Sequence, residues 1–389
     1  MFEGRTVLVQ LLDHLPRHTF RRVVKRYEGD YRVRSFTCWD QFVAMVFAQL
    51  TYRESLRDIE ACLGAVPERL FHLGFRSRTV SRSTLADANE SRDWRIYADF
   101  AQVLIKEARR LYAGERLATE LDQTVYALDA TTIDLCLALF PWARFRRTKS
   151  AIKVHTLLDL NGSIPTFIRI TPGTVNEMNI LDELVAEPGS IYVMDRGYTD
   201  FKRLHRLHQD QAFFVIRGKQ RLDFQRRYSH HSDCPTIICD QTVVLRGPLS
   251  SKRYPDALRR IRAKDPETGK RITLLTNHFQ LPAATVADLY RSRWRVELFF
   301  KWIKQHLRIK AFYGTSDNAV KTQIWIAISV YVLVAIVKKR LGLKRDLYTL
   351  LQILSLHLFE KTELLPMLST TDCPNSPSAS PNQLQLFDF

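Results

Sequence analysis

Three features common in secreted and membrane proteins are missing from this chain of 389 residues. Its six cysteines are scattered without a repeated spacing, which is typical of reduced intracellular thiols and not of a disulfide framework. Its longest apolar run, residues 324–337, is about fourteen residues long, whereas a membrane-spanning helix needs about twenty. The first residues show no basic start followed by an apolar block, so no secretion signal is indicated. We therefore expect a cytoplasmic protein with no membrane partner, in which residues 324–337 form a buried helix.

The chain also has fewer acidic than basic residues. The chain has 41 Asp and Glu against 58 Lys and Arg, which gives a formal net charge of +17. This balance favours a phosphate-bearing partner and binding that weakens as salt is added. Charge alone does not separate nucleic acid from an anionic membrane, but the short apolar run argues against the membrane. Because 46% of the residues are hydrophobic, the chain can bury a large core and hold two or more domains.

The stretch poorest in acids is residues 288–310 (DLYRSRWRVELFFKWIKQHLRIK), which we expect to form one long helix. Between its first residue and Asp317, the only carboxylate is Glu297. At about 100° per residue, one arc of this helix is polar and another is apolar. The polar arc holds Tyr290, Arg293, Glu297, Lys301 and Lys304. The lone acid has an ordinary explanation, ion pairs with Arg293 and Lys301 one turn away. It also stands where a polyanion is expected to lie.

Two aspartates lie on apolar strands upstream. From residue 124 the pattern predicts three strands joined by tight turns at Asn161-Gly162 and Pro172-Gly173, which indicates an antiparallel meander. A helix over residues 176–186, a short strand, a helix over residues 200–209 and another strand are expected to follow. Asp129 lies on the first strand, and Asp195 ends the fourth. Taken singly, each aspartate is equally well explained as an acid that caps a loop.

The spacing of Tyr290, Arg293, Glu297 and Lys304, with two aspartates upstream, resembles the signature of the DDE-type insertion-sequence transposases. The branch is the one related to insertion sequence four, and the resemblance covers about residues 120–360. The helical N-terminal region expected before residue 120 also agrees with this family. It implies an α/β fold with a ribonuclease H-like catalytic core, whose order of strands and helices agrees with the predicted one. It also implies that Asp129, Asp195 and Glu297 converge as catalytic metal ligands.

The cofactor implied by the resemblance is a pair of Mg²⁺ ions, for which Mn²⁺ can substitute. Three carboxylates crowded together without cations would repel one another, and hard oxygen ligands suit these ions. Two ions can stabilise both the attacking and the leaving oxygen of an in-line displacement at phosphorus. The implied reaction frees a 3′-hydroxyl at the transposon end and uses it to attack target DNA.

The residues expected to contact DNA come from two basic segments. They are Tyr290, Arg293, Lys301, Lys304, Lys153 and Arg147. The resemblance assigns Tyr290, Arg293 and Lys304 to phosphates at the transposon end, where Arg can fork two oxygens and Lys acts as a point charge. The second segment, residues 144–153 (RFRRTKSAIK), lies between the first two strands. It either lines the DNA path or is a solvated loop.

Three regions are expected in order: a helical DNA-binding domain (1–115), a catalytic domain (116–365) with a β-rich insertion (219–282), and a flexible tail (366–389). In the first, Ser81 or Ser83 is expected to cap a short helix in a basic link, residues 76–89. This suits a helix-turn-helix-like module that contacts phosphates, although a helical bundle with a solvated basic turn has the same pattern. The resemblance places terminal-repeat recognition in this domain. The Ser- and Pro-rich composition of the tail predicts disorder.

The end of the tail carries a separate motif, Gln383–Phe387 (QLQLF). It resembles the pentapeptide by which bacterial proteins dock on the replication sliding clamp, and a chance apolar terminus is the alternative. For the whole chain we predict a Mg²⁺-dependent DNA transposase of the bacterial cytoplasm, associated with the nucleoid, that acts as a homodimer on double-stranded DNA. The rival functions are a catalytically inert repressor of the terminal repeats and a nuclease that cuts but never joins.

Overall fold

The computed structural model describes residues 4–115, 121–219, 222–266, 268–306 and 312–369. The predicted clamp-binding motif, residues 383–387, lies outside these ranges. The predicted tail begins inside a helix, because residues Leu364–Ser369 form α14, in which Leu364 and Leu368 are buried one turn apart. The part of the tail from residue 370 onward is not described.

The N-terminal part of the chain is helical, as the 3- and 4-residue spacing of its apolar residues predicts. Its helices are α1 (Val7–Leu12), α2 (Arg17–Arg26), α3 (Cys38–Leu50), α4 (Leu56–Gly64), α5 (Pro67–His72), α6 (Arg82–Ser91) and α7 (Arg95–Tyr112). Side chains fix where these helices begin. Thr37 with Asp40, and Ser55 with Asp58, form capping boxes at the starts of α3 and α4. Ser81 caps α6, as expected from the sequence.

The rest of the described chain is built on one mixed sheet. Its strands are β1 (Val125–Leu135), β2 (Arg144–Arg146), β3 (Lys149–Asp159), β4 (Ile164–Pro172), β5 (Ile191–Met194), β6 (Phe213–Arg217), β7 (Phe224–His230), β8 (Ile237–Leu245), β9 (Leu258–Lys264) and β10 (Arg271–Thr276). Their order is β2-β3-β1-β5-β6-β10-β9-β8-β7, with β4 also paired to β3. The predicted antiparallel pairing of β1, β3 and β4 is confirmed. A tight turn joins only β3 to β4, whereas residues 136–148, which include a 3₁₀ helix and β2, join β1 to β3.

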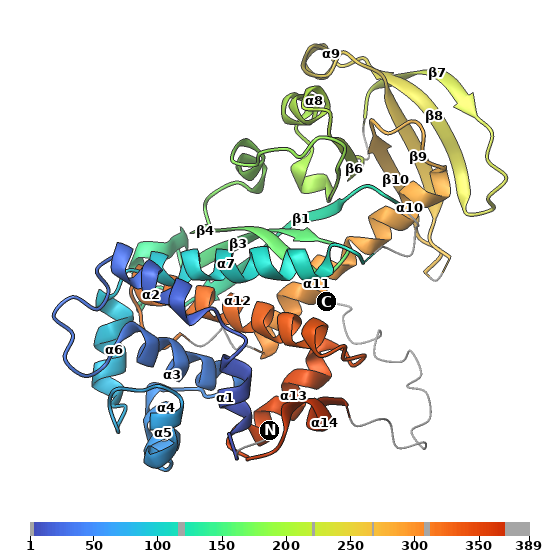
Figure 1. Cartoon of the computed structure of the whole chain (residues 1–389). Coiled ribbons are helices and arrows are strands. Elements are labelled where there is room, and N and C mark those ends of the chain that lie inside the picture. Colours follow the sequence, from blue (N-terminus) through green and yellow to red (C-terminus); the bar gives the residue numbers. More distant parts are fainter. Residues whose placement is uncertain (1–3, 116–120, 220–221, 267, 307–311, 370–389) are drawn as a thin grey trace.

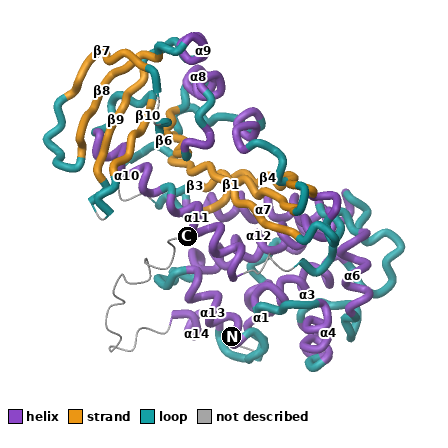
Figure 2. Tube along the Cα trace, turned by 180° about the vertical axis from the view of Figure 1, so that it is seen from behind, coloured by secondary structure: helices purple, strands orange, loops and turns teal. Residues whose placement is uncertain are grey.

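The segment β4-β3-β1-β5-β6 has the topology of the ribonuclease H-like fold. Strand β5 runs parallel to β1 and to β6, and helix α8 (Phe201–Gln209) connects β5 to β6. The strands of the insertion continue this sheet, because β10 pairs antiparallel with the other edge of β6. A buried ion pair joins β8 to β9, with 2.6 Å between Arg259 Nη2 and Asp240 Oδ2. Figures 1 and 2 show this extension at the end of the molecule opposite to helices α3, α4 and α6.

Alternation along β1 separates two layers of core. Val125 and Ala127 belong to the core that includes α7 and the C-terminal helices, whereas Tyr126 and Leu128 belong to a second core under α8. Figure 1 shows α7 lying along β3 and β4. Asp129 has the same parity as Ala127, so its side chain points to the face over which α11 (Trp294–Lys301) packs on β1.

The apolar run near the C-terminus forms part of the long helix α12 (Asp317–Arg340), as predicted. By length and composition α12 would be able to cross a membrane, but 94% of its most apolar stretch is buried inside the protein. It packs against α7, α3 and α6, and also against α13 (Leu347–His357). α12 is therefore the central helix that joins the N-terminal helices to the helices that follow the sheet.

The start of α12 gives a test of local stability. Ser316 caps it by accepting a hydrogen bond of 3.1 Å from the backbone N–H of Ala319. Ser316→Ala is expected to lower the free energy of unfolding by about 1 kcal/mol, measured by urea denaturation. Ser355→Ala is the control, because its hydroxyl only bonds back to Gln352 O within α13, where alanine suits the helix. Equal effects of the two substitutions would contradict the role of Ser316.

Two predicted helices differ from those observed. The single helix expected over residues 288–310 is divided into α10 (Ala283–Ser292), α11 and a π-helical turn, Trp302–His306; residues 307–311 are not described. The break follows Ser292, whose hydroxyl bonds to Leu289 O at 2.7 Å and competes with the helical ladder. The helix expected over residues 176–186 is only a 3₁₀ helix, Glu177–Asp182. Only two adjacent residues are buried there, so there is no stripe to stabilise an α-helix.

Candidate active site

The sheet register places the two aspartates on neighbouring strands. Strands β1 and β5 are parallel, and Leu128 pairs with Met194. Asp129 and Asp195 directly follow this pair of residues on their two strands, so the two aspartates lie side by side. Asp195 is followed directly by the 3₁₀ helix Arg196–Tyr198, which turns the chain away from the sheet. The two aspartates predicted from the sequence are thus brought to one end of this strand pair.

The third acid reaches the same place through Arg293. The Nη1 atom of Arg293 lies 2.6 Å from Asp129 Oδ2, and its Nη2 atom is paired with Glu297 Oε1. Tyr290 donates a hydrogen bond of 3.0 Å to Asp195 Oδ1. The guanidinium of Arg293 lies over the ring of Tyr290. Residues that are 164 positions apart in the chain therefore meet, and all three predicted acids belong to one connected cluster.

Burial makes the charge of this cluster costly. The pKa of Asp129 is raised to about 6, chiefly by burial; Arg293 opposes the shift, and the nearby charges of Glu297 and Glu177 add to it. Burial and the charge of Asp195 raise the pKa of Tyr290 to about 12. Negative charge at Asp129 is thus unfavourable unless a cation stands beside it. In this structure the cation is Arg293.

Two further residues of the cluster were not found from the sequence. Glu177 is close enough to Asp129 to raise its pKa, and it pairs with Lys153 at 3.3 Å. The buried hydroxyl of Tyr198 finds no hydrogen-bond partner in the described part of the chain. Burial raises its pKa well above the usual range, and the charges of Asp129, Glu177 and Asp195 add to the shift. No sequence signal indicated Glu177, which lay inside the helix predicted over residues 176–186. Tyr198 could have been found from its position three residues after Asp195.

The other predicted DNA contacts lie at different distances from the acids. Lys304 donates to Thr132 O of β1 at 2.7 Å, and Lys153 on β3 is the register partner of Thr132, so both lysines lie at a position three residues along β1 from Asp129. Lys301 and Arg147 are exposed, and within the described ranges neither makes a hydrogen bond or ion pair with the acids. Contact of these residues with DNA stays a prediction.

The donor set fits a hard divalent cation. The three carboxylates belong to one cluster linked through Arg293 and Tyr290, and the buried hydroxyl of Tyr198, which has no partner among the described residues, lies near Asp129 and Asp195. Carboxylate and hydroxyl oxygens are ligands that hard divalent cations prefer. Within the described residues no three acids, histidines or cysteines stand ready to ligate one ion, and Arg293 stands between Asp129 and Glu297. Asp129, Asp195 and Glu297 are the side chains that would hold such an ion once Arg293 is displaced. The assignment of the ligands stays a prediction.

His155, predicted to be structural, is fully buried on β3. Its Nε2 lies 2.9 Å from Thr171 Oγ1, and burial lowers its pKa to about 4, with the charges of Lys153 and Arg169 adding to the shift. The unfolded chain, with an ordinary histidine pKa near 6.5, takes up the proton first as the pH falls. The stability that the neutral imidazole provides is therefore present above pH 6.5 and is lost as the pH falls toward 4.

This shift gives a pH-dependent prediction. Between pH 7 and pH 5 the wild-type protein is expected to lose about 2 kcal/mol more of its free energy of unfolding than His155→Gln loses. Urea denaturation of both proteins at both pH values measures this difference. The comparison cancels the titration of other groups and any constant cost of the substitution. Identical pH dependence of the two proteins would contradict the burial of a neutral His155.

A ribonuclease H-like sheet with acids on its first strand, after its fourth strand and on a later helix defines a class of enzymes that cut or join nucleic acid strands. Within that class the chain belongs to the DDE transposases, in a family like that of insertion sequence four. The family model described as the transposase DDE domain matches residues 120–333. A second model, described as a domain of unknown function, matches residues 3–76. The resemblance drawn from the signature residues is confirmed.

Individual relatives agree with this membership. The putative transposase y4zB of Sinorhizobium fredii is 35% identical over 257 residues, covering 65% of this chain and 70% of the relative. The probable transposase for insertion sequence element IS5377 of Geobacillus stearothermophilus is 29% identical over 223 residues, covering 56% and 58%. The putative transposase for insertion sequence element IS4SA of Synechocystis is 24% identical over 320 residues, covering 81% and 87%.

A solved structure, a piggyBac transposase synaptic complex with hairpin DNA, is similar at 12% identity with a TM-score of 0.44, covering 91% of this chain and 78% of that one. The family as a whole generally uses divalent metal ions. By its membership of the DDE transposase family the chain is a transposase, an enzyme of DNA transposition.

Proposed function

We propose that the protein binds the terminal inverted repeats of its own insertion sequence, cleaves the element ends and joins the freed 3′-hydroxyl to target DNA. The observation that carries this proposal is the contact of Arg293 with both Asp129 and Glu297, next to the contact of Tyr290 with Asp195. Two of the three residues that the family signature assigns to DNA phosphates, Tyr290 and Arg293, are the ones that contact the three acids here.

This arrangement suggests how the site is assembled. A phosphate of the transposon end competes with the carboxylates for Arg293, since a guanidinium can fork two phosphate oxygens. With Arg293 and Tyr290 turned to the DNA, Asp129, Asp195 and Glu297 would be free to hold two Mg²⁺ ions. When bound, these ions stabilise the attacking and leaving oxygens of an in-line displacement at phosphorus. Arg293 then keeps the end in position beside the acids.

The test is incubation of the purified protein with a labelled transposon end, Mg²⁺ and a supercoiled target. Cleavage followed by joining of the labelled strand to the target supports the proposal. Cleavage without joining would favour a nuclease, and binding without cleavage would favour a repressor. The substrate is supplied by the inverted repeats in the DNA that flanks the gene.

Two partners belong to the same proposal. We expect the protein to act as a homodimer on paired ends, so light scattering of the protein–end complex should give two protein chains and two ends. A complex with one chain would contradict the dimer.

The C-terminal motif, residues 383–387, is proposed to dock on the replication sliding clamp. Deleting residues 383–389 should abolish co-purification with the clamp. Unchanged co-purification would remove the proposal.

A further inference from the structure

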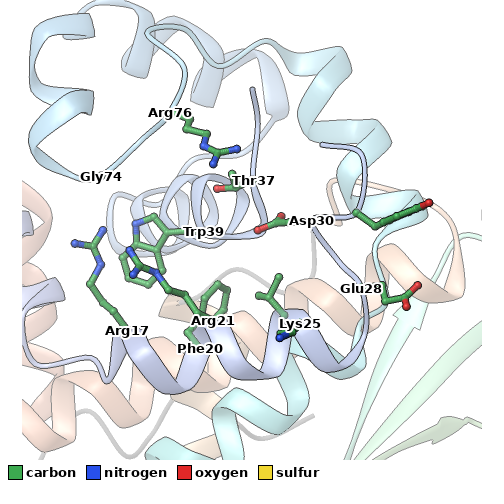
Figure 3. Close-up of a pocket in the computed structure, with 12 residues that line it drawn as sticks. Arg17, Phe20, Arg21, Lys25, Glu28, Asp30, Thr37, Trp39, Gly74 and Arg76 are labelled. Atoms are coloured by element: carbon green, nitrogen blue, oxygen red, sulfur yellow. The ribbon is translucent and has the colours of Figure 1, made fainter. Parts of the chain in front are cut away.

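A cleft of about 630 Å³ lies in the helical N-terminal region, far along the chain from the three acids. Its floor is α2, and its other walls are the loop before α3, the start of α3 and the loop that follows α5. Figure 3 shows Arg17, Arg21 and Lys25 rising from α2, with Trp39 above them and Arg76 on the opposite side. The cleft lies within residues 3–76, the segment that matches a domain of unknown function.

The cleft is basic along its length. Arg17, Arg21 and Lys25 recur every fourth residue, which sets them on one face of α2 at about 6 Å intervals along the helix axis. Helix α2 (RHTFRRVVKR) contains no acid. The side chains of Arg21, Lys25 and Arg76 are exposed and form no ion pair with any residue that the structure describes. A row of unpaired cations facing another across a cleft is suited to a ligand with several negative charges in line.

Two acids reach the cleft but do not neutralise it. Glu28 lies at one end of the lining, beyond Lys25, and Asp30 lies above Lys25 on the side of Thr37 (Figure 3). Asp30 is already engaged, because it accepts the backbone N–H of Cys38 at 2.6 Å. The cations therefore outnumber the acids, and the basic row on α2 is open to an anion.

Aromatic rings provide the second kind of surface. The indole N–H of Trp39 donates to Leu73 O at 3.1 Å, which fixes the ring, and the guanidinium of Arg17 lies 4.3 Å from its centroid. Tyr31, at the rim, is 67% exposed. Aromatic and guanidinium planes of this kind stack on nucleic acid bases with little regard to sequence. Paired bases in a duplex show only their edges in the grooves, so a ring in such a cleft meets the face of an unpaired base.

We propose that this cleft binds a single-stranded segment of DNA, with phosphates on Arg17, Arg21, Lys25 and Arg76 and an unpaired base against Tyr31 and Trp39. The proposal concerns binding only and does not depend on the acids that cut the strand. A loss of DNA cleavage and a loss of single-strand binding in this cleft can therefore be told apart.

The test uses a fluorescent oligothymidylate of about fifteen nucleotides, a length near the upper limit of one single-strand binding site. A duplex of unrelated sequence and equal length is the comparison ligand. Fluorescence anisotropy with the full-length protein gives both affinities over a range of salt concentrations. Tyr31→Ala is expected to weaken oligothymidylate binding at least about fivefold, the lower limit for loss of one stacked base, and to leave duplex binding unchanged. Tyr31 is exposed, so this substitution does not disturb the core.

A matched pair on α2 tests the cations. Arg21→Ala should weaken oligothymidylate binding. It should also make the slope of log K against the logarithm of the salt concentration shallower by about 0.7, the value for one phosphate contact on a single strand. Arg22→Ala removes the same charge from the next residue, which does not line the cleft, and should change the affinity less than about twofold. Equal effects of Arg21→Ala and Arg22→Ala would overturn the proposal. So would oligothymidylate binding that is unchanged in Tyr31→Ala.

Discussion

Asp129→Asn is expected to bind a labelled transposon end as tightly as the wild-type protein and to cut it at least about a thousand times more slowly. The substitution keeps the shape of the side chain but removes the charge that a divalent cation requires. The loss corresponds to about 4 kcal/mol of transition-state stabilisation, the scale of a metal contact. Band-shift and single-turnover cleavage assays measure the two quantities. Asp195→Asn and Glu297→Gln are expected to behave in the same way.

The control lies on the same strand. Asp134 is an exposed residue of β1, and within the described chain it makes no hydrogen bond or ion pair with the acids of the site. Asp134→Asn should therefore cut at the wild-type rate. Normal cleavage by Asp129→Asn, or an equal loss in Asp134→Asn, would contradict the assignment of Asp129 as a catalytic residue.

Arg293→Gln is expected to have two opposite effects. Without DNA, the variant should bind Mn²⁺ more tightly than the wild-type protein, because Asp129 and Glu297 lose the cation that they now share. With DNA, it should cut the transposon end about a hundredfold more slowly, because it loses about 3 kcal/mol of charged contact with the phosphate. Electron paramagnetic resonance of free Mn²⁺ measures the first effect, and single-turnover cleavage measures the second.

Arg291→Gln serves as the matched control for Arg293. Arg291 lies on exposed surface of α10 and pairs with Asp288. Its replacement should leave Mn²⁺ affinity unchanged and cleavage within about twofold of wild type. If Arg293→Gln bound Mn²⁺ no more tightly than wild type, Arg293 would not compete with the cation for the acids.

Much of the core was predictable because its signals are local. The turn signal at Asn161-Gly162 predicted the hairpin of β3 and β4, and the apolar residues before Asp129 and Asp195 predicted the strands that lead to them. The contact between Arg293 and Asp129 was not predictable from spacing along one helix. It depends on how α11 crosses β1 and on the register of two strands that are far apart in the chain.

The pairing of the insertion's strands with the rest of the sheet was likewise not predictable from the sequence. Its strand-like pieces were visible in the sequence, and β8 and β10 fall on them. Their attachment to β6 was not visible, because a strand pattern does not identify its partner. The interrupted helix has a different cause. The apolar period runs through Arg293 without a break, whereas α10 ends at Ser292, whose side-chain hydrogen bond to Leu289 O is not visible in the periodicity.

The central claim is that Asp129, Asp195 and Glu297 together hold the catalytic ions. Anomalous scattering from Mn²⁺ in crystals of the protein bound to its transposon end tests this directly. The account predicts Mn²⁺ peaks at about 2.0–2.3 Å from carboxylate oxygens of all three residues, with Arg293 turned to a DNA phosphate. Mn²⁺ bound elsewhere, with Arg293 still between Asp129 and Glu297 in a complex that cuts DNA, would contradict it.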